Sequence, residues 1–267
     1  MKSVRPKKNL GQHFLTDLNI AKAIADTVDA CDKIPVLEVG PGMGVLTQYL
    51  VQKQRDVKVV EIDSESVAYL NEKYPALREN VIGEDFLRMD LNKVFEGQQF
   101  VLTGNYPYDI SSQIFFKMLD NKDLIPCCTG MIQREVAQRM ASQPGNKAYG
   151  ILSVLIQAWY DVEYLFTVDE NVFNPPPKVK SAVIRMTRNK VTDLGCNEPL
   201  FKRVVKTVFN QRRKMLRVSL RQMFAGKAPR EGFYQQDIMT KRPEQLSIPQ
   251  FVELTNMVDA EYAALEK

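Results

Sequence analysis

A glycine-rich turn between an apolar segment and a helical segment constrains the fold of this chain most. The apolar run Val36 to Val39 is typical of a short buried strand. Three glycines follow it at alternate positions, namely Gly40, Gly42 and Gly44. Glycines at these positions let the backbone approach a ligand closely. The spacing is Gly-x-Gly-x-Gly rather than Gly-x-Gly-x-x-Gly, which argues against a dinucleotide pyrophosphate as the ligand.

Strand and helix patterns alternate on both sides of this turn. Apolar runs predict strands at 36–39, 57–61, 81–82, 100–103 and 130–133. Helical spacing predicts helices at 17–30, 45–51, 64–73 and 111–119, with Ser64 as a capping residue. This order predicts an α/β fold, a Rossmann-like parallel sheet with helices on both faces.

The end of the sheet and the rest of the chain follow other patterns. Residues 162–168 and 179–187 read as two strands with no helix between them, so they predict an antiparallel pair. After Asn189 the pattern is helical to the end of the chain. We therefore expect a catalytic domain at 1–188 and a small all-helical domain at 189–267.

Polar residues stand where the predicted parallel strands end. Glu61 follows the second strand and can accept both hydroxyls of a ribose. Asp85 follows the third strand and can accept a hydrogen from an adenine amine. Together with the glycine turn and Asn105 after the fourth strand, these positions predict a site for an adenosyl cofactor.

The segment Asn105-Tyr106-Pro107-Tyr108 has the chemistry needed to alkylate a flat amine. The lone pair of a nucleobase amine is drawn into the ring, so the amine needs hydrogen-bond acceptors to become nucleophilic. Asn105 offers an amide and Tyr108 a stacking face. Pro107 stiffens the turn and can aim the carbonyl of Tyr106 into a pocket.

The basic residues are clustered. The segment from Pro199 to Arg230 contains ten Lys and Arg residues and no acid. Lys2, Arg5, Lys7 and Lys8 form a second cluster without acids. Without these fourteen, the remaining 22 basic residues face 32 acidic ones. An acidic body with two basic segments indicates a polyanionic partner, and we expect a nucleic acid.

Other classes of protein are disfavoured. His13 is the only histidine, which argues against histidine-based triads and histidine-rich metal sites, and we expect no metal. The four cysteines have no metal-binding spacing, so we expect reduced thiols in a cytoplasmic protein. No apolar run reaches membrane-spanning length and residues 1–8 are too polar for a signal peptide, so no membrane partner is expected.

Several of these segments together resemble the small-subunit ribosomal RNA adenine dimethyltransferases (KsgA/RsmA type). The matching segments are Gly11–Leu15, Glu38–Gly44, Glu61, Gly83–Asp85, Asn105–Tyr108, Phe173–Lys178 with Ser181, and Phe209–Lys214. The resemblance spans essentially the whole chain. It implies that S-adenosylmethionine is the methyl donor. It also implies that two adjacent adenosines in the 3′-terminal hairpin loop of 16S rRNA are dimethylated at N6, during biogenesis of the 30S subunit.

The resemblance also implies roles for individual residues. The cofactor would contact His13, Leu15, Gly40, Gly42, Gly44, Glu61, Asp85 and Asn105. The catalytic set would be Asn105, Tyr106, Pro107, Tyr108 and Phe173, with Tyr108 and Phe173 sandwiching the target base. RNA would contact Lys178, Arg212, Arg213, Lys214 and Arg217, and the protein would act as a monomer. The chain departs from the family at two positions, with His13 in place of the common Asn and Tyr106 in place of Leu.

Three other functions remain open on sequence alone. An Erm-type 23S rRNA adenine methyltransferase uses the same chemistry on the large subunit. A non-catalytic nucleic-acid-binding factor on the same fold, like mitochondrial transcription factor B, would have degraded cofactor residues, which this chain retains. A DNA adenine methyltransferase would be expected to carry an added target-recognition domain.

Overall fold

The computed structural model describes residues 4–266, which form two compact units. Of the described residues, unit 1 comprises 4–137 and 160–188, and unit 2 comprises 138–159 and 189–266. The predicted boundary after residue 188 coincides with one of these divisions. Residues 138–159, however, which we placed in the catalytic domain, pack with the C-terminal segment.

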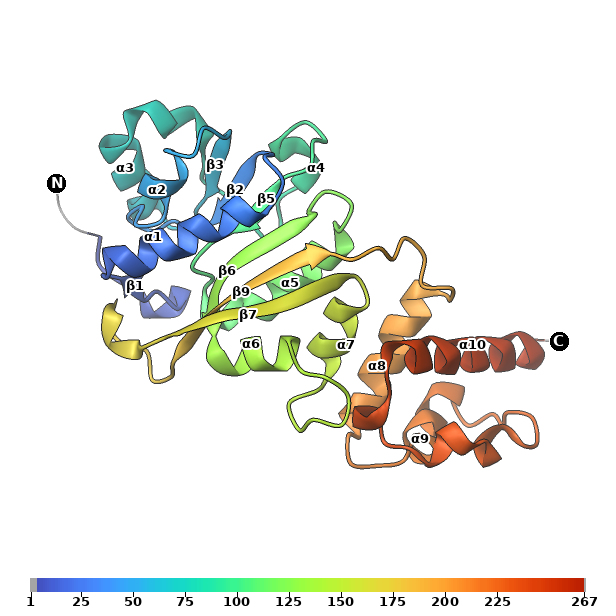
Figure 1. The fold of residues 1–267 in the computed structure, drawn as a ribbon. Helices are drawn as coiled ribbons and strands as arrows, with labels where there is room; N and C mark the ends of the chain where they lie inside the picture. Colours follow the sequence, from blue (N-terminus) through green and yellow to red (C-terminus); the bar gives the residue numbers. More distant parts are fainter. Residues whose placement is uncertain (1–3, 267) are drawn as a thin grey trace. The chain divides into compact units, whose positions relative to one another are not determined.

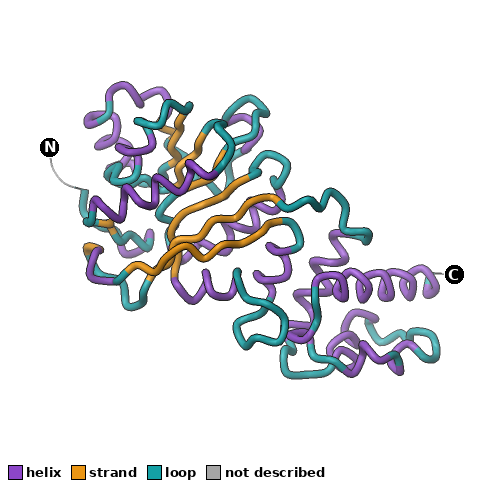
Figure 2. The backbone as a smooth tube through the Cα atoms, in the orientation of Figure 1, coloured by secondary structure: helices purple, strands orange, loops and turns teal. Residues whose placement is uncertain are grey.

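Unit 1 is built on a seven-stranded mixed sheet with the order β4-β3-β2-β5-β6-β9-β7 (Figures 1 and 2). The strands are β2 (Val36–Val39), β3 (Val57–Val60), β4 (Val81–Ile82), β5 (Val101–Thr103), β6 (Cys127–Gln133), β7 (Tyr160–Val168) and β9 (Ser181–Arg188). The first five are parallel, whereas β9 pairs antiparallel with both β6 and β7. The Rossmann-like sheet with an antiparallel end that the sequence predicts is therefore confirmed.

A two-stranded ribbon ties the N-terminal segment to the loop before β9. In it, β1 (Phe14–Leu15) pairs antiparallel with β8 (Phe173–Asn174). The hydroxyl and amide groups of Thr16 both donate to the carbonyl of Val172, at 2.9 and 2.8 Å. The ribbon thus holds the N-terminal segment against unit 1.

The helices of unit 1 are α1 (Leu18–Asp26), α2 (Thr47–Leu50), α3 (Ser64–Lys73), α4 (Leu91–Val94) and α5 (Ser111–Asp120). A further helix, α6 (Arg134–Met140), runs across the division between the units. Asp63 rather than Ser64 caps α3, because its carboxylate accepts from the backbone amide of Glu65 at 3.2 Å. The apolar spacing therefore predicted this helix correctly, while its cap lies one residue earlier.

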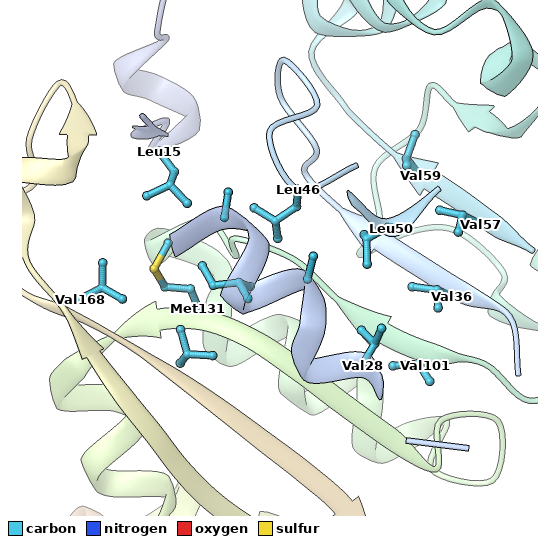
Figure 3. Close-up of a cluster of buried hydrophobic side chains, with 14 of the residues drawn as sticks. Leu15, Val28, Val36, Leu46, Leu50, Val57, Val59, Val101, Met131 and Val168 are labelled. Atoms are coloured by element: carbon cyan, nitrogen blue, oxygen red, sulfur yellow. The ribbon is translucent and has the colours of Figure 1, made fainter. Parts of the chain in front are cut away.

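The core of unit 1 lies on the face of the sheet that α1 covers (Figure 3). The buried face of α1 contributes Ala21, Ile24 and Ala25, and Val28 follows it. These side chains share a cluster with one face of the parallel strands and with the α2 segment. Figure 3 labels its members Val36, Val57, Val59, Val101, Met131, Leu46 and Leu50. Burial of this apolar surface fixes the sheet and therefore the positions at which its strands end.

Unit 2 is helical and contains α7 (Ile151–Gln157), α8 (Glu198–Asn210), α9 (Leu216–Ser219) and α10 (Ile248–Leu265). The predicted apolar stripe of α8 is confirmed as core, since Leu200, Val204, Val208 and Phe209 are buried. The ring of Phe209 lies 6.2 Å from that of Tyr149 and 5.8 Å from that of Phe251, measured between centroids. The Tyr149 hydroxyl also donates to the carbonyl of Leu246 at 2.8 Å. These contacts explain why residues 138–159 belong to this unit.

No helix among residues 4–266 is both long and apolar enough to cross a lipid bilayer.

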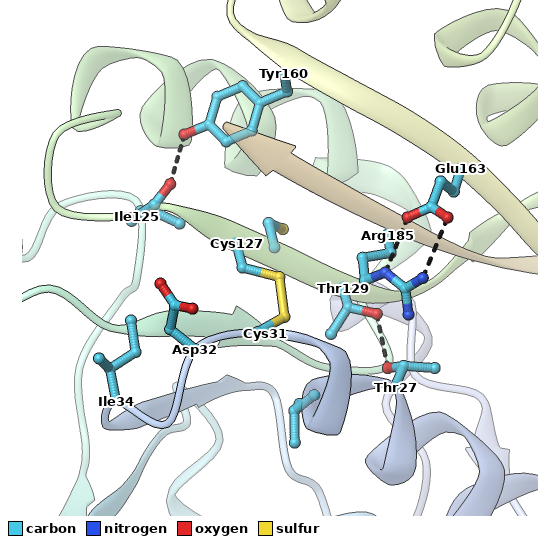
Figure 4. Close-up of a disulfide and its surroundings, with 12 residues drawn as sticks. Thr27, Cys31, Asp32, Ile34, Ile125, Cys127, Thr129, Tyr160, Glu163 and Arg185 are labelled. Atoms are coloured by element: carbon cyan, nitrogen blue, oxygen red, sulfur yellow. Dashed lines mark hydrogen bonds and ion pairs between the residues drawn. A yellow bond between two sulfur atoms is a disulfide. The ribbon is translucent and has the colours of Figure 1, made fainter. Parts of the chain in front are cut away.

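A disulfide joins Cys31, just beyond α1, to Cys127 at the start of β6 (Figure 4). Their Cα atoms are 6.1 Å apart, and the hydroxyl of Thr129 donates to that of Thr27 at 2.7 Å beside them. Cys128 and Cys196 are free. Our expectation that all four cysteines are reduced is therefore wrong for one pair, because the fold brings together two residues that lie 96 positions apart.

We predict that this disulfide stabilises unit 1. Closing a loop of this length restricts the unfolded chain, an effect of about 4–5 kcal/mol at most. Reduction, or the double change Cys31→Ser with Cys127→Ser, should lower Tm, and Cys196→Ser is the matched control. Thiol titration of the unfolded protein should find two free thiols before reduction and four after it. A Tm that is insensitive to reductant would contradict the prediction.

Candidate functional site

A cavity of about 250 Å³ in unit 1 lies at the carboxyl ends of the central parallel strands. The strands that end here are neighbours in the order β4-β3-β2-β5, and residues 9–15 form another wall. The cavity brings together most of the residues singled out from sequence: His13, Leu15, Gly40, Gly42, Glu61, Asp85, Asn105, Tyr106, Pro107 and Tyr108. Such an edge of an open parallel sheet is where α/β folds bind ligands.

Two glycines of the turn after β2 are required by close packing. Gly42 has a φ of 55°, and a Cβ there would lie 3.0 Å from the ring of Phe14. Gly44 has a φ of 81°, and its Cβ would lie 2.6 Å from the ring of Tyr74. Gly44 is not among the residues that line the cavity, so its contact with the cofactor stays a prediction. It serves the packing of Tyr74, whose hydroxyl donates to its carbonyl at 3.2 Å.

The carboxylate of Glu61 is buried and oriented by backbone amides. The amide of Gly42 donates to Oε2 at 3.1 Å, and the amide of Asp63 donates to Oε1 at 2.9 Å. Burial raises the pKa of Glu61, while these two hydrogen bonds favour its charged form. The side chain that the sequence assigned to a ribose is thus held in one place by the protein's own backbone.

Asp63 links this carboxylate to the N-terminal segment. It accepts hydrogen bonds from Lys7, from Gln12 at 3.3 Å and from Ser66 at 3.0 Å. Although burial alone would raise the pKa of Asp63, these bonds lower it. Lys7 also pairs with Glu65 at 3.1 Å. Lys7 therefore holds the N-terminal segment through ion pairs and is engaged within the protein. Lys2, which belongs to the same basic cluster, lies outside the described residues.

A second buried acid, Glu38 in β2, was not among the predicted site residues. It lines the cavity and accepts a hydrogen bond from the hydroxyl of Thr47 at 2.6 Å. Burial raises the pKa of Glu38 to about 8, to which the nearby charge of Glu61 contributes. At neutral pH Glu38 therefore mostly keeps its proton, which spares the site a second buried anion. An acidic residue inside an apolar strand was the sequence feature that could have identified Glu38 as a site residue.

The amide of Asn105 is oriented by the N-terminal segment. Its Nδ2 donates to the carbonyl of His13 at 3.4 Å, which leaves Oδ1 to accept a hydrogen from a ligand. The backbone of the next residue is fixed as well, since the amide of Tyr106 donates to the carbonyl of Met131 at 3.0 Å. Two potential acceptors for an amine are therefore held in place, one by the N-terminal segment and one by β6.

The ring of Tyr106 belongs to the core. Its hydroxyl donates to the carbonyl of Thr129 at 2.9 Å and lies 3.2 Å from Sγ of Cys128. Its ring packs edge-on against Phe115 of α5, with centroids 5.6 Å apart. Gly130 makes room for it, because a Cβ there would lie 2.7 Å from the Tyr106 ring. The departure at this position is thus accommodated away from the cavity.

Tyr108 lies at the cavity, but its predicted partner Phe173 does not. Tyr108 makes a hydrogen bond with Ser181 through its hydroxyl, and burial raises the pKa of Tyr108, so it stays protonated. Phe173 is only 4% exposed and packs in the hydrophobic cluster with Leu15 and Val168. The ring that faces Tyr108 is that of His13, with centroids 5.6 Å apart. Pairing in the β1–β8 ribbon places Phe173 in the core, so the stacking role expected for it stays a prediction.

The predicted RNA-binding residues differ in whether their side chains are exposed or are engaged in contacts within the protein. Arg213, Lys214 and Arg217 in unit 2 are exposed, as is Lys178 in unit 1. Arg212 instead pairs with Glu244 at 3.0 Å and donates to the carbonyl of Asn146 at 3.3 Å. Arg212 thus has a structural role within unit 2. Among residues 4–266 no group of three or more His, Cys, Asp or Glu side chains is arranged to hold a metal ion.

Comparison with known proteins agrees with this geometry. The family model described as "Ribosomal RNA adenine dimethylase" matches residues 4–259. The chain is 69% identical over 257 residues to Ribosomal RNA small subunit methyltransferase A of Phocaeicola vulgatus, covering 96% of this chain and 91% of the relative. It is 67% identical over 259 residues to the protein of that name from Bacteroides thetaiotaomicron, covering 97% and 96%.

Two solved structures share the fold over nearly the whole chain. A dimethyladenosine transferase from Plasmodium falciparum has a TM-score of 0.78 at 23% identity, covering 94% of this chain and 98% of its own. The 23S rRNA methyltransferase ErmE has a TM-score of 0.65 at 28% identity, covering 92% and 99%. The family match and the high identities show that the chain belongs to the ribosomal RNA adenine dimethylase family.

Proposed function

We propose that the protein is an S-adenosylmethionine-dependent methyltransferase that dimethylates N6 of two adjacent adenosines in the 3′-terminal hairpin loop of 16S rRNA. The observation that carries this proposal is the single cavity in which a carboxylate fixed by backbone amides, Glu61, lies with the recognition segment Asn105 to Tyr108. Family membership and the names of its relatives support the same activity.

The residues present fit an adenosyl cofactor. Glu61 is held so that its remaining lone pairs can accept the two hydroxyls of a ribose, and Asp85 can accept from the adenine amine. The turn at Gly40 and Gly42 carries no side chains at these positions, so a cofactor can approach its backbone closely. His13 and Leu15 complete the wall of the cavity. When bound, S-adenosylmethionine would supply an electrophilic methyl group.

The protein's own part in the reaction is to position the amine. In the first methylation the Oδ1 of Asn105 and the carbonyl of Tyr106 accept the two amine hydrogens, which favours attack by the nitrogen lone pair, and the proton released on alkylation passes to solvent. In the second methylation the amine presents one remaining hydrogen to these acceptors. Tyr108 stacks on the base, offsetting part of the few kcal/mol that unstacking it from RNA costs. Most of the rate acceleration comes from holding the amine in line with the methyl group and its good leaving group. A general base is therefore not required.

The substrate is proposed to be the 30S subunit or its assembly precursor, bound by a monomer in the cytoplasm. Exposed Arg213, Lys214 and Arg217 offer phosphate contacts on unit 2, and Lys178 offers one on unit 1. The Erm-type alternative rests on 28% identity to ErmE. Identities of 67–69% to small-subunit enzymes favour the small subunit. The intact cavity argues against a non-catalytic factor.

Cofactor affinity should depend on Glu61. Loss of charge-assisted hydrogen bonds to a ribose costs about 1.5–3 kcal/mol, so Glu61→Gln should weaken S-adenosylmethionine binding about 10- to 150-fold in calorimetry. Glu72→Gln, on an exposed face of α3, is the matched control. Unchanged affinity in a folded Glu61→Gln protein would remove this residue from the cofactor site.

Catalysis should depend on the side chain of Asn105 and not on the hydroxyl of Tyr106. Asn105→Ala removes the oriented acceptor and should lower the single-turnover methylation rate of undermethylated 30S particles at least about a hundredfold. Tyr106→Phe keeps the carbonyl and the ring, so its rate should stay close to that of the wild type. Its Tm should fall, because the carbonyl of Thr129 loses a buried donor. Near-normal methylation by Asn105→Ala would rule out this arrangement of acceptors.

RNA binding should depend on the exposed basic residues of unit 2. Neutralising Arg213, Lys214 and Arg217 together should weaken 30S binding and make the slope of log K against log salt shallower by about 2–3. Arg212 is left intact because its ion pair with Glu244 supports the fold. The charge-matched control neutralises Lys33, Lys93 and Lys190, which are also exposed. If the two triple variants show equal particle affinity and salt slope, this surface is not the RNA-binding site.

A further inference from the structure

The side chain of His13 is directed at the base-recognition segment. Its ring stacks on that of Tyr108 with centroids 5.6 Å apart and an angle of 27° between the ring planes. Its Nδ1 lies 2.8 Å from the carbonyl oxygen of Pro175, to which it can donate in the tautomer that carries the proton there. The imidazole is therefore held between two segments of unit 1, and it borders the cavity.

This stack supplies a restraint that the other contacts of Tyr108 lack. The hydroxyl of Tyr108 is bonded to Ser181, which is fully buried at the start of β9. The phenol oxygen lies on the long axis of the ring, so this bond fixes the tip of the ring and restrains rotation about that axis only weakly. A ring stacked on one face fixes the plane, and aromatic pairs favour such offset geometry.

The backbone of the same residue orients the other recognition group. The carbonyl of His13 accepts from Nδ2 of Asn105 at 3.4 Å, which leaves Oδ1 as the acceptor for the target amine. Both ends of the recognition segment, Asn105 and Tyr108, are thus contacted by one residue of the N-terminal segment. The β1–β8 ribbon beside it, with Phe14 opposite Asn174, holds that residue in place.

We propose that His13 is a positioning residue for the target base, acting through the plane of the Tyr108 ring, and that its side chain does not bind the cofactor. The inference rests on the proposed methyltransferase function. Any cofactor contact from this position then comes from the backbone. An Asn at this position cannot provide an aromatic stack, so the ring-to-ring contact is a feature of this chain's His13.

Three substitutions separate the roles of the imidazole. His13→Ala removes the ring, His13→Phe keeps a stacking ring without the bond to Pro175, and His13→Asn keeps a polar group without a ring. Each variant is measured for Tm, S-adenosylmethionine affinity, 30S affinity and single-turnover methylation of undermethylated 30S particles. Wild type and Asn105→Ala are the active and inactive references.

We expect His13→Ala and His13→Asn to methylate about three- to tenfold more slowly than the wild type, a range set by the strength of an aromatic pair. Their affinities for cofactor and particle should stay within about twofold of the wild type. His13→Phe should recover the rate to within about twofold. This pattern separates a positioning role from a general loss of structure, because only the rate follows the presence of a ring.

Other outcomes would overturn the inference. Wild-type rates in His13→Ala would show that the stack does not position the base. A loss of cofactor affinity that parallels the loss of rate would make His13 a cofactor residue. Recovery by His13→Asn but not by His13→Phe would assign the effect to the bond with Pro175. Failure of the wild type to methylate 30S particles would overturn the proposed function as well, whereas equal rates for wild type and His13→Ala would overturn only this inference.

Discussion

The buried carboxylate of Glu61 is the interaction on which the arrangement of the site depends. Its two oxygens accept from the amides of Gly42 and Asp63, so they join the turn after β2 to the end of β3. Asp63 then engages Lys7 and Gln12, which fixes the N-terminal segment at the same place. A carboxylate removed from water is stable only with such partners. Its burial therefore imposes the geometry of three segments that are distant in sequence.

Burial and hydrogen bonding together decide which acids in and beside the cavity carry charge. Glu38 is raised to a pKa of about 8, whereas Asp63, with a Lys partner, has its pKa lowered. Between the ordinary pKa of a glutamic acid and about 8, folded Glu38 holds a proton that the unfolded chain has lost. Its contribution to stability is therefore full below that window and declines as pH rises through it. The site concentrates its negative charge on the carboxylates that hydrogen bonds stabilise.

Sequence reasoning succeeded where one local pattern determines the outcome. The parallel strands and their carboxyl ends were predictable because buried strands are apolar runs, and a sheet brings the residues that follow them together. The β1–β8 ribbon was not predictable, since each strand has two residues and no periodicity. The burial of Phe173, the packing role of Gly44, the ion pair of Arg212 and the Cys31–Cys127 disulfide all depend on partners 30 or more positions away. No local signal specifies such partners.

Tyr106 shows how the core can fix a recognition carbonyl without its side chain entering the cavity. Its hydroxyl is bonded to Thr129 of β6 and its ring packs on Phe115 of α5, while Gly130 leaves the space that the ring requires. Burial raises the pKa of the neighbouring Cys128 thiol to about 12, so this thiol remains a neutral partner of the hydroxyl. A smaller aliphatic residue would leave empty the space that the Tyr106 ring fills. It would also remove the hydroxyl that donates to the carbonyl of Thr129. In this chain the ring and the glycine opposite it thus form one packing solution, and the carbonyl at the cavity is held by the core behind it.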